Sequence, residues 1–362
     1  VVVTGAGRVE DTFNLIGHAA REVVATVAKR LGLTVEEAAQ RAGIPLLTGT
    51  SLKATLDINW DDPTEKKAAL ERLLGQVSAL GEFLQRELAD ALATPPLAEQ
   101  WATVRQILAQ DLEPDPGGGT RIRCGVAKER RVSVRDPQMR HGRKSKSSRF
   151  DGFKRHLALD VDNGVILGAA ITPGNRPEGE AADDLFGDVE RQGLRVAHLH
   201  IDRGYLAAPA VEARRATGTE VYCKPFPLQN AGRFTKADFQ LDLDAGRVTC
   251  PAGQSTPLIP GSVAHFPARA CQPCLLRSRC TAAARGRSLS IHPHEPFLIE
   301  LRARQRTPDG RALLRKRIPV EHSLAGISRT QGRRARYIGI RKNLFDLRRH
   351  AAVFNLYATA RA

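Results

Sequence analysis

The amino-acid sequence predicts an α/β fold, preceded by an all-helical region and interrupted by a cysteine-rich loop insertion. Three observations support this prediction. Apolar residues recur at helical spacing through the first third of the chain, short apolar runs follow in the middle, and four cysteines cluster in a stretch rich in proline and glycine. The predicted segments are a helical region (1–113), a linker (114–134), an α/β core (135–224), the cysteine-rich insertion (225–290) and a C-terminal helical part (291–362).

The first segment contains several helix boundary signals. Apolar positions between 9 and 31 predict a helix that Gly32 ends. Thr34-Val-Glu-Glu37 is a capping box for a second helix. Asp62-Pro63 begins a long helix that we expect to reach residue 93, and a shorter helix follows over 97–112.

Between the helical region and the core, Pro114-Asp-Pro-Gly-Gly-Gly119 predicts a linker without regular structure. The basic residues, serines and glycines of 135–156 predict a flexible basic loop that leads into the core.

The core contains a hairpin and a parallel unit. Asp162-Asn-Gly164 separates apolar runs at 153–161 and 165–172, which is a strong hairpin signal. A helix is expected over 178–192. Beyond it, a strand at 196–201, a helix at 206–216 and a strand at 219–223 predict a βαβ unit with parallel strands. Helices are also expected from 319 and over 343–360.

The charge distribution is uneven. The chain has 55 Lys and Arg against 39 Asp and Glu, for a net charge of +16. Residues 1–120 have 11 basic and 17 acidic residues, whereas residues 121–362 have 44 basic and 22 acidic residues. Such a basic body favours a polyanionic partner, and nucleic acid is the commonest; the alternative is a charged face that only water covers.

No run of about 18 apolar residues predicts a membrane span, and no leader peptide pattern opens the chain. We therefore expect a cytoplasmic protein that has no contact with membranes.

Asp202 is the first candidate site residue. It follows the apolar run 196–201 directly, and α/β sheets place their chemistry at such strand ends. A carboxylate there suits a divalent metal ion, while the alternative is a turn residue that supports Gly204.

Glu321 is the second candidate. It stands in the first turn of a predicted helix, where the helix dipole favours a carboxylate without any further role. However, residues 301–349 contain 15 Arg or Lys and only three carboxylates. A metal ligand beside a bound phosphate backbone and a simple partner for arginine are both consistent with this setting.

The basic residues favour binding of a nucleic-acid backbone. The candidates for DNA contact are Arg143, Lys144, Lys146, Lys154, Arg155, Arg329, Arg333, Arg334, Arg336, Arg341 and Lys342.

The clustered cysteines are Cys250, Cys271, Cys274 and Cys280. The Cys271-Gln-Pro-Cys274 pair is a good half-site for tetrahedral Zn²⁺, and the other two thiols complete a structural four-cysteine site. Four reduced thiols without metal are the alternative.

Taken in order, these pieces resemble the DDE transposases of bacterial insertion sequences, in the subgroup with a cysteine-rich insertion before the last carboxylate. The resemblance covers about residues 135–356. It is carried by Asp151-Gly-Phe-Lys-Arg-His156 with the hairpin, Thr172-Pro-Gly-Asn175, Ile201-Asp-Arg-Gly-Tyr205, the four cysteines, Val320-Glu-His322, Arg336-Tyr-Ile-Gly-Ile-Arg-Lys342 and 351–355.

The resemblance implies an RNase H-like mixed sheet with flanking helices and three carboxylates that hold two Mg²⁺ ions. Asp202 matches the second carboxylate and Glu321 the third. It also implies cleavage and strand transfer at insertion-sequence ends in double-stranded DNA, a homodimer on that DNA, and a bacterial, nucleoid-associated location.

The first carboxylate of the family does not have a match. In the family it lies in an Asp-Ser/Thr-Ser/Thr motif on the first strand, just ahead of a segment like Gly5–Leu15, but residues 1–4 are Val-Val-Val-Thr. We therefore expect an N-terminally truncated chain whose metal site is incomplete and whose helical region follows a missing strand. Asp160 is the only obvious substitute for the missing carboxylate, but we expect it to be a strand-end residue, because the family pattern does not make it a ligand. Asp11 is expected to be a helix-start residue.

Three functions stay open at this point: a transposase catalytic region, an inactive remnant that binds DNA, and a metal-dependent nuclease of the same fold. An upstream Asp motif distinguishes the first from the second, and a joined DNA product distinguishes the first from the third.

Overall fold

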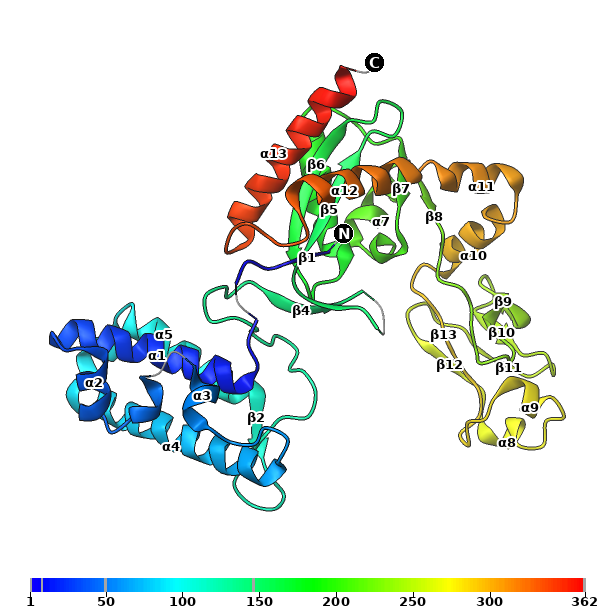
Figure 1. The fold of residues 1–362 in the computed structure, drawn as a ribbon. Coiled ribbons are helices and arrows are strands. Elements are labelled where there is room, and N and C mark those ends of the chain that lie inside the picture. The colour runs from blue at the N-terminus through cyan, green and yellow to red at the C-terminus, as the bar shows by residue number, and fades with distance from the viewer. Residues whose placement is uncertain (1, 8, 49–50, 145–146, 361–362) are drawn as a thin grey trace. The chain divides into compact units, whose positions relative to one another are not determined.

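The structure is a computed structural model that describes residues 2–7, 9–48, 51–144 and 147–360 (Figure 1). It is a mixed α/β structure with small sheets, which confirms the predicted α/β class. The chain divides into two compact units, which we describe separately. The first consists of residues 1–189 and 322–362, and the second of residues 190–321.

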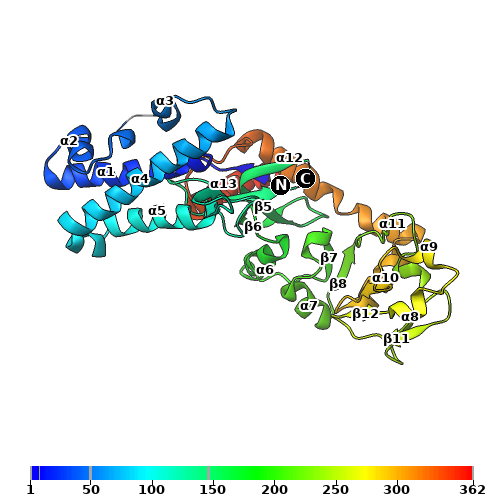
Figure 2. The ribbon, with the colours of Figure 1, turned by 90° about the horizontal axis from the view of Figure 1, so that it is seen from below.

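The helices of the N-terminal region share one apolar core. They are α1 (Thr12–Leu31), α2 (Val35–Arg41), α3 (Leu52–Leu56), α4 (Pro63–Glu87) and α5 (Leu97–Asp111), with 3₁₀ turns at Pro45–Leu47 and Ala89–Ala93. Figure 2 shows α1, α4 and α5 side by side, and their inward residues are fully buried. From α1 to α5 the described elements are all helical, as expected. Residues 2–4, which were expected to belong to the same helical region, instead form a strand that pairs with the sheet described below.

The helix boundary signals are confirmed where they can be checked. Asp11 caps α1 by accepting from the backbone N–H of Asn14, and Gly32 ends that helix with a left-handed φ of 66°. Thr34 and Glu37 form the capping box. The long helix α4 ends at Glu87, earlier than expected, because Leu88 has a φ of −139°, outside the helical range.

Residues 112–122 form a hairpin. Its turn, residues 115–119, has no regular structure, as expected, whereas Pro114 belongs to a strand. Strands β2 (Leu112–Pro114) and β3 (Thr120–Ile122) pair antiparallel. Pro116 and the three glycines after it lie in the turn between them, and Lys67 Nζ lies 2.9 Å from Asp115 Oδ2 at that turn. The glycines favour a turn without preventing the short strands on either side.

The sheet of the first unit is built on β5 (Arg149–Leu159). Strands β1 (Val2–Thr4), β4 (Arg140–Arg143) and β6 (Ile166–Pro173) all pair antiparallel with it. The β5–β6 hairpin confirms the prediction from Asn-Gly. The expected flexible loop at 135–156 is instead largely the β4–β5 hairpin, because residues 149–156 belong to the long strand β5.

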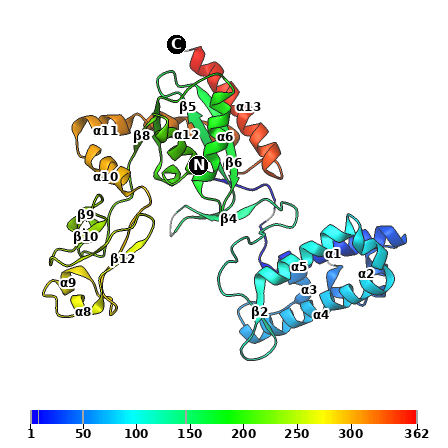
Figure 3. The same cartoon turned by 180° about the vertical axis from the view of Figure 1, so that it is seen from behind.

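Helices cover this sheet. The 3₁₀ turn Glu178–Ala181 leads into α6 (Ala182–Glu190), and α12 (Ile318–Gln331) and α13 (Ile340–Thr359) return from the C-terminal part. Figure 3 shows α6 and α13 beside β6. The Asn355 side chain of α13 accepts from the backbone N–H of Ile166 and donates to its carbonyl, both at 2.8 Å.

The second unit begins with the predicted βαβ unit. Strands β7 (His198–Ile201) and β8 (Glu220–Cys223) pair in parallel, and α7 (Pro209–Ala216) connects them after a 3₁₀ turn at Arg203–Tyr205. Helices α10 (Glu295–Arg304) and α11 (Pro308–Arg315) close this unit before α12 begins.

The cysteine-rich insertion has its own small core within the second unit. Strands β9 (Gln240–Asp242), β10 (Arg247–Thr249) and β11 (Ser255–Pro257) form one antiparallel sheet, and β12 (Val263–His265) pairs with β13 (Ser288–Ser290). A 3₁₀ turn at Lys236–Asp238 and the four-residue helices α8 (Ala268–Cys271) and α9 (Arg277–Cys280) complete it. Phe239, Val248 and Phe266 are among its buried residues.

None of the helices in the described part of the chain combines the length and the apolar character that a membrane span needs.

A buried histidine in β5 gives the first prediction. His156 is 4% exposed, its ring hydrogen-bonds to Thr172 Oγ1 at 2.9 Å, and burial lowers its pKa to about 3. An unfolded histidine has a pKa of about 6.5, so below that pH only the unfolded state takes up this proton. The contribution of neutral, buried His156 to the free energy of unfolding is therefore complete above about pH 6.5 and is lost as the pH falls toward 3. At pH 5 the loss is about 2 kcal/mol.

Urea unfolding at pH 7 and pH 5 checks this prediction. His156→Gln removes the titrating ring, so this variant should lose less stability between the two pH values than the unmodified chain. An equal loss in both proteins would assign the acid sensitivity to other groups.

Candidate functional site

Asp202 lies immediately after β7, at the end of the parallel pair. It caps the 3₁₀ turn Arg203–Tyr205, and its Oδ1 accepts from the backbone N–H of Arg203 at 2.8 Å. The side chain remains 51% exposed. The expected turn role is therefore present, and it occupies Oδ1 of the carboxylate.

Glu321 lies in the first turn of α12 and is 57% exposed. Its Oε1 accepts from Arg317 Nη2 at 2.6 Å. The other terminal nitrogen of the same guanidinium, Nη1, lies 3.9 Å from Asp202 Oδ2. The structure therefore brings the two predicted carboxylates together around Arg317.

Arg317 was not singled out from the sequence. The signal that could have found it is its spacing, since an Arg and a Glu four residues apart meet on one helix face. Its contact with Asp202 depends on the tertiary fold and could not be found in that way.

A buried thiol interacts with Asp202. Cys223 ends β8 opposite Ile201 and is 1% exposed. Burial, and then the negative charge of Asp202, raise the pKa of Cys223 to about 12, while Arg203 and Arg317 act in the opposite direction. The thiol therefore stays protonated at neutral pH.

Asp160 lies elsewhere in the fold. It occupies the turn of the β5–β6 hairpin, where its carboxylate accepts from the backbone N–H of Asp162, and the Asn163 side-chain hydrogen bond lowers its pKa. This is the strand-end role expected for it. In the part of the chain that the structure describes, no three His, Cys, Asp or Glu side chains are grouped as a metal site.

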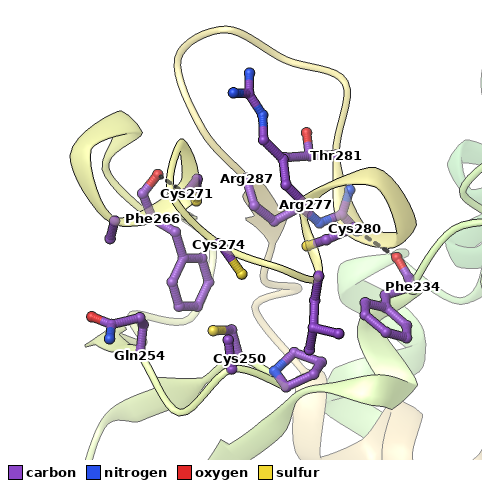
Figure 4. A pocket seen from close by; sticks show the side chains of 14 residues that line it. Phe234, Cys250, Gln254, Phe266, Cys271, Cys274, Arg277, Cys280, Thr281 and Arg287 are labelled. Atoms are coloured by element: carbon purple, nitrogen blue, oxygen red, sulfur yellow. Dashed lines mark hydrogen bonds between the residues drawn. The ribbon is translucent and has the colours of Figure 1, made fainter.

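The four clustered cysteines line one small pocket of the insertion (Figure 4). Cys250 follows β10, Cys271 ends α8, Cys274 follows it, and Cys280 ends α9. Burial raises the pKa of Cys280, and the other three thiols add to this effect while Arg287 opposes it. The four thiols thus share one pocket, but among the described residues they are not close enough together to form a metal site.

Most of the predicted DNA-contact residues are exposed in the first unit. These are Arg143, Lys144, Arg329, Arg333, Arg334, Arg336, Arg341 and Lys342. Lys154 is half-buried and donates to the carbonyl of Arg176, and Lys146 lies outside the described residues.

Arg155 lies in the interior, 2% exposed, and is therefore removed from the set of DNA contacts. Its guanidinium donates to Gln331 Oε1 at 2.7 Å and to Ser328 Oγ at 3.2 Å. Its burial follows from α12, because Ser328 and Gln331 of that helix lie against its guanidinium.

Comparison with known families identifies the C-terminal part of the chain. Residues 249–360 match a family described as "Transposase DDE domain". Residues 249–360 are of the DDE transposase type. The match includes the four clustered cysteines, Glu321 and the exposed arginines that follow it, and the resemblance inferred from the sequence is confirmed at this level. Searches of curated proteins and of solved structures give no match.

Proposed function

We propose that this DDE transposase chain is a catalytic region that cleaves and joins insertion-sequence DNA with the help of a divalent metal ion. The observation that carries the proposal is the convergence of Asp202 and Glu321, which are distant in sequence, on the guanidinium of Arg317. Two carboxylates that face one cation in this way also suit a metal ion.

The donor set fits Mg²⁺. Mg²⁺ is commonly held by one or two carboxylates together with waters and the phosphates of the substrate. Asp202 and Glu321 supply two such carboxylates, both more than half exposed and so within reach of a phosphate backbone. When bound, divalent ions would activate a water or a DNA 3′-hydroxyl and stabilise the leaving oxygen of an in-line displacement.

In this proposal the protein's own residues position the two carboxylates and bind the DNA. The end of β7 fixes Asp202 through the Arg203 turn, and the first turn of α12 fixes Glu321. The exposed basic residues of the first unit hold the double-stranded DNA by its phosphates.

Several finer assignments belong to the same proposal. The antiparallel run β1–β5–β6 and the parallel pair β7–β8 supply the two kinds of strand pairing that an RNase H-like mixed sheet contains. The five-segment division of the chain, the homodimer on DNA and the nucleoid-associated location also remain proposals.

A single assay on the purified chain distinguishes the three functions. The chain is incubated with labelled insertion-sequence end DNA, a target plasmid and Mg²⁺, and the products are separated on denaturing gels. Joined product supports the transposase. Nicked product alone supports the nuclease, and a shifted but intact DNA supports the binding remnant, so either result would overturn the proposed reaction.

The basic surface gives the second prediction. Replacing Arg333, Arg334 and Arg336 together by Gln should weaken DNA binding and reduce the slope of log K against log salt by about 2 to 3, because each lost phosphate contact releases about 0.9 fewer counterions. Fluorescence anisotropy at several salt concentrations measures this slope. Arg285→Gln, in the insertion, is the control, and an unaltered slope in the triple variant would place the DNA on another surface.

The cysteine pocket gives the third prediction. We propose that Cys250, Cys271, Cys274 and Cys280 bind one structural Zn²⁺, because all four thiols line the same pocket and thiolates are the preferred ligands of structural Zn²⁺. The small core of the insertion also needs such support, since four-residue helices have little stability of their own.

Metal analysis of the purified chain should find one zinc per molecule. Cys271→Ser with Cys274→Ser should lose this zinc, whereas Cys124→Ser, at an exposed cysteine outside the pocket, should retain it. A chain that is folded and free of zinc after growth in zinc-supplemented medium would contradict the assignment and favour four reduced thiols.

A further inference from the structure

Arg317 occupies the space between the two carboxylates. It stands after α11 and one residue before α12 begins. One terminal nitrogen contacts Glu321 at 2.6 Å and the other faces Asp202 at 3.9 Å. Because both nitrogens belong to one small planar group, the two carboxylates face the same position.

The charge at this position is permanent. An arginine guanidinium remains protonated at every pH that a folded protein tolerates. Arg317 therefore offsets one of the two negative charges of Asp202 and Glu321 whenever it lies between them, and it faces the oxygen atoms that a divalent cation would need.

The contacts are also weak enough to exchange. The three side chains are 34%, 51% and 57% exposed for Arg317, Asp202 and Glu321. Ion pairs with this much access to water contribute little net stability. A divalent cation, with twice the charge, can displace a partner of this kind without disturbing the surrounding fold.

We propose that Arg317 and a divalent cation compete for Asp202 and Glu321, so that Arg317 holds the two carboxylates paired until metal binds. This inference rests on the proposed function, since it takes these carboxylates as the metal ligands. It adds a residue that controls when the site accepts metal. The displaced guanidinium, whose planar fork matches a phosphate, is then free to contact the DNA backbone.

The test is a titration of the full chain with Mn²⁺ in the absence of DNA, with free Mn²⁺ followed by its electron paramagnetic resonance signal. Arg317→Gln removes the competing charge and should tighten Mn²⁺ binding about two- to tenfold, the range expected for loss of exposed ion pairs. Arg317→Lys keeps the positive charge but not the planar guanidinium, so its Mn²⁺ affinity should lie between those of the unmodified chain and Arg317→Gln. Arg315→Gln is the matched control, because it removes the same charge two residues earlier, from an exposed position at the end of α11, and should leave the affinity unchanged.

Further measurements distinguish failure of the competition from failure of the proposed metal site itself. Asp202→Asn combined with Glu321→Gln should remove the Mn²⁺ site; if this double variant binds Mn²⁺ like the unmodified chain, the proposed metal site itself is wrong. If the double variant loses the site but Arg317→Gln binds Mn²⁺ no more tightly than the unmodified chain, only the competition is wrong. Raising the salt concentration should also reduce the difference between Arg317→Gln and the unmodified chain, since exposed ion pairs are screened.

Discussion

In a protein that also carries the first carboxylate, Asp202→Asn and Glu321→Gln should each reduce metal-dependent DNA cleavage by about a thousandfold or more, while DNA binding is retained. Each change replaces a carboxylate with a neutral amide of the same shape, so the fold is preserved and the negative charge that holds the metal is reduced. A bound metal contributes several kcal/mol to stabilising the charge of a phosphoryl transition state, and each 1.36 kcal/mol is a tenfold change in rate. Cleavage of labelled end DNA with Mg²⁺ measures the loss.

The control for these variants is Asp309→Asn, which neutralises an exposed carboxylate in the first turn of α11. It should cleave like the unmodified chain. Anisotropy measurements should show the same DNA affinity for all three variants. Unreduced cleavage by Asp202→Asn or Glu321→Gln would remove that residue from the site, and parallel loss of DNA binding would indicate a damaged fold.

Asp346→Asn should destabilise the first unit by about 3 to 5 kcal/mol. Asp346 is 1% exposed and accepts from Gln331 Nε2 and Arg349 Nη2, each at 2.7 Å. Gln331 in turn accepts from the buried guanidinium of Arg155. Asp346 also favours the charged form of Arg155, whose pKa burial lowers.

The reason for this large effect is the buried positive charge. Removing one member of a buried, hydrogen-bonded charge network leaves the opposite charge without compensation in a medium of low dielectric constant. Urea denaturation gives the free energy of unfolding for Asp346→Asn, with Arg155→Met and the double variant completing a cycle. The double variant should lose less than the sum of the two single changes, since it removes both charges together. Additive losses would mean that the two residues are not coupled.

Local signals predicted much of the fold. The caps at Asp11, Thr34 and Asp62 confirmed three helix starts, because a cap involves atoms only a few residues apart. Asn163-Gly164 predicted the hairpin turn for the same reason. The strand–helix–strand order of residues 196–223 predicted the parallel pairing of β7 and β8, because parallel strands need a crossover connection.

Features that depend on distant contacts could not be predicted in this way. Composition alone made 135–156 a basic loop, yet residues 149–156 pair with β1, β4 and β6 and lie at the centre of a sheet. Arg155 was read as a DNA contact because its neighbours are basic, whereas α12 lies against its guanidinium and buries it. For the candidate site, the two carboxylates were proposed from their strand-end and helix-start positions, but the guanidinium between them was visible only in the fold.

The amide of Asn355 has a consequence for the solubility of the protein. Among the described strands, β6 pairs only with β5, so its outer edge would otherwise offer free backbone groups to a strand of another molecule. Asn355 occupies both backbone groups of Ile166, and Asp188 Oδ2 accepts from the backbone N–H of Ala169 at 3.0 Å. Two side chains thus stand where a neighbouring strand would add. They therefore shield this edge of β6 from pairing with a strand of another molecule.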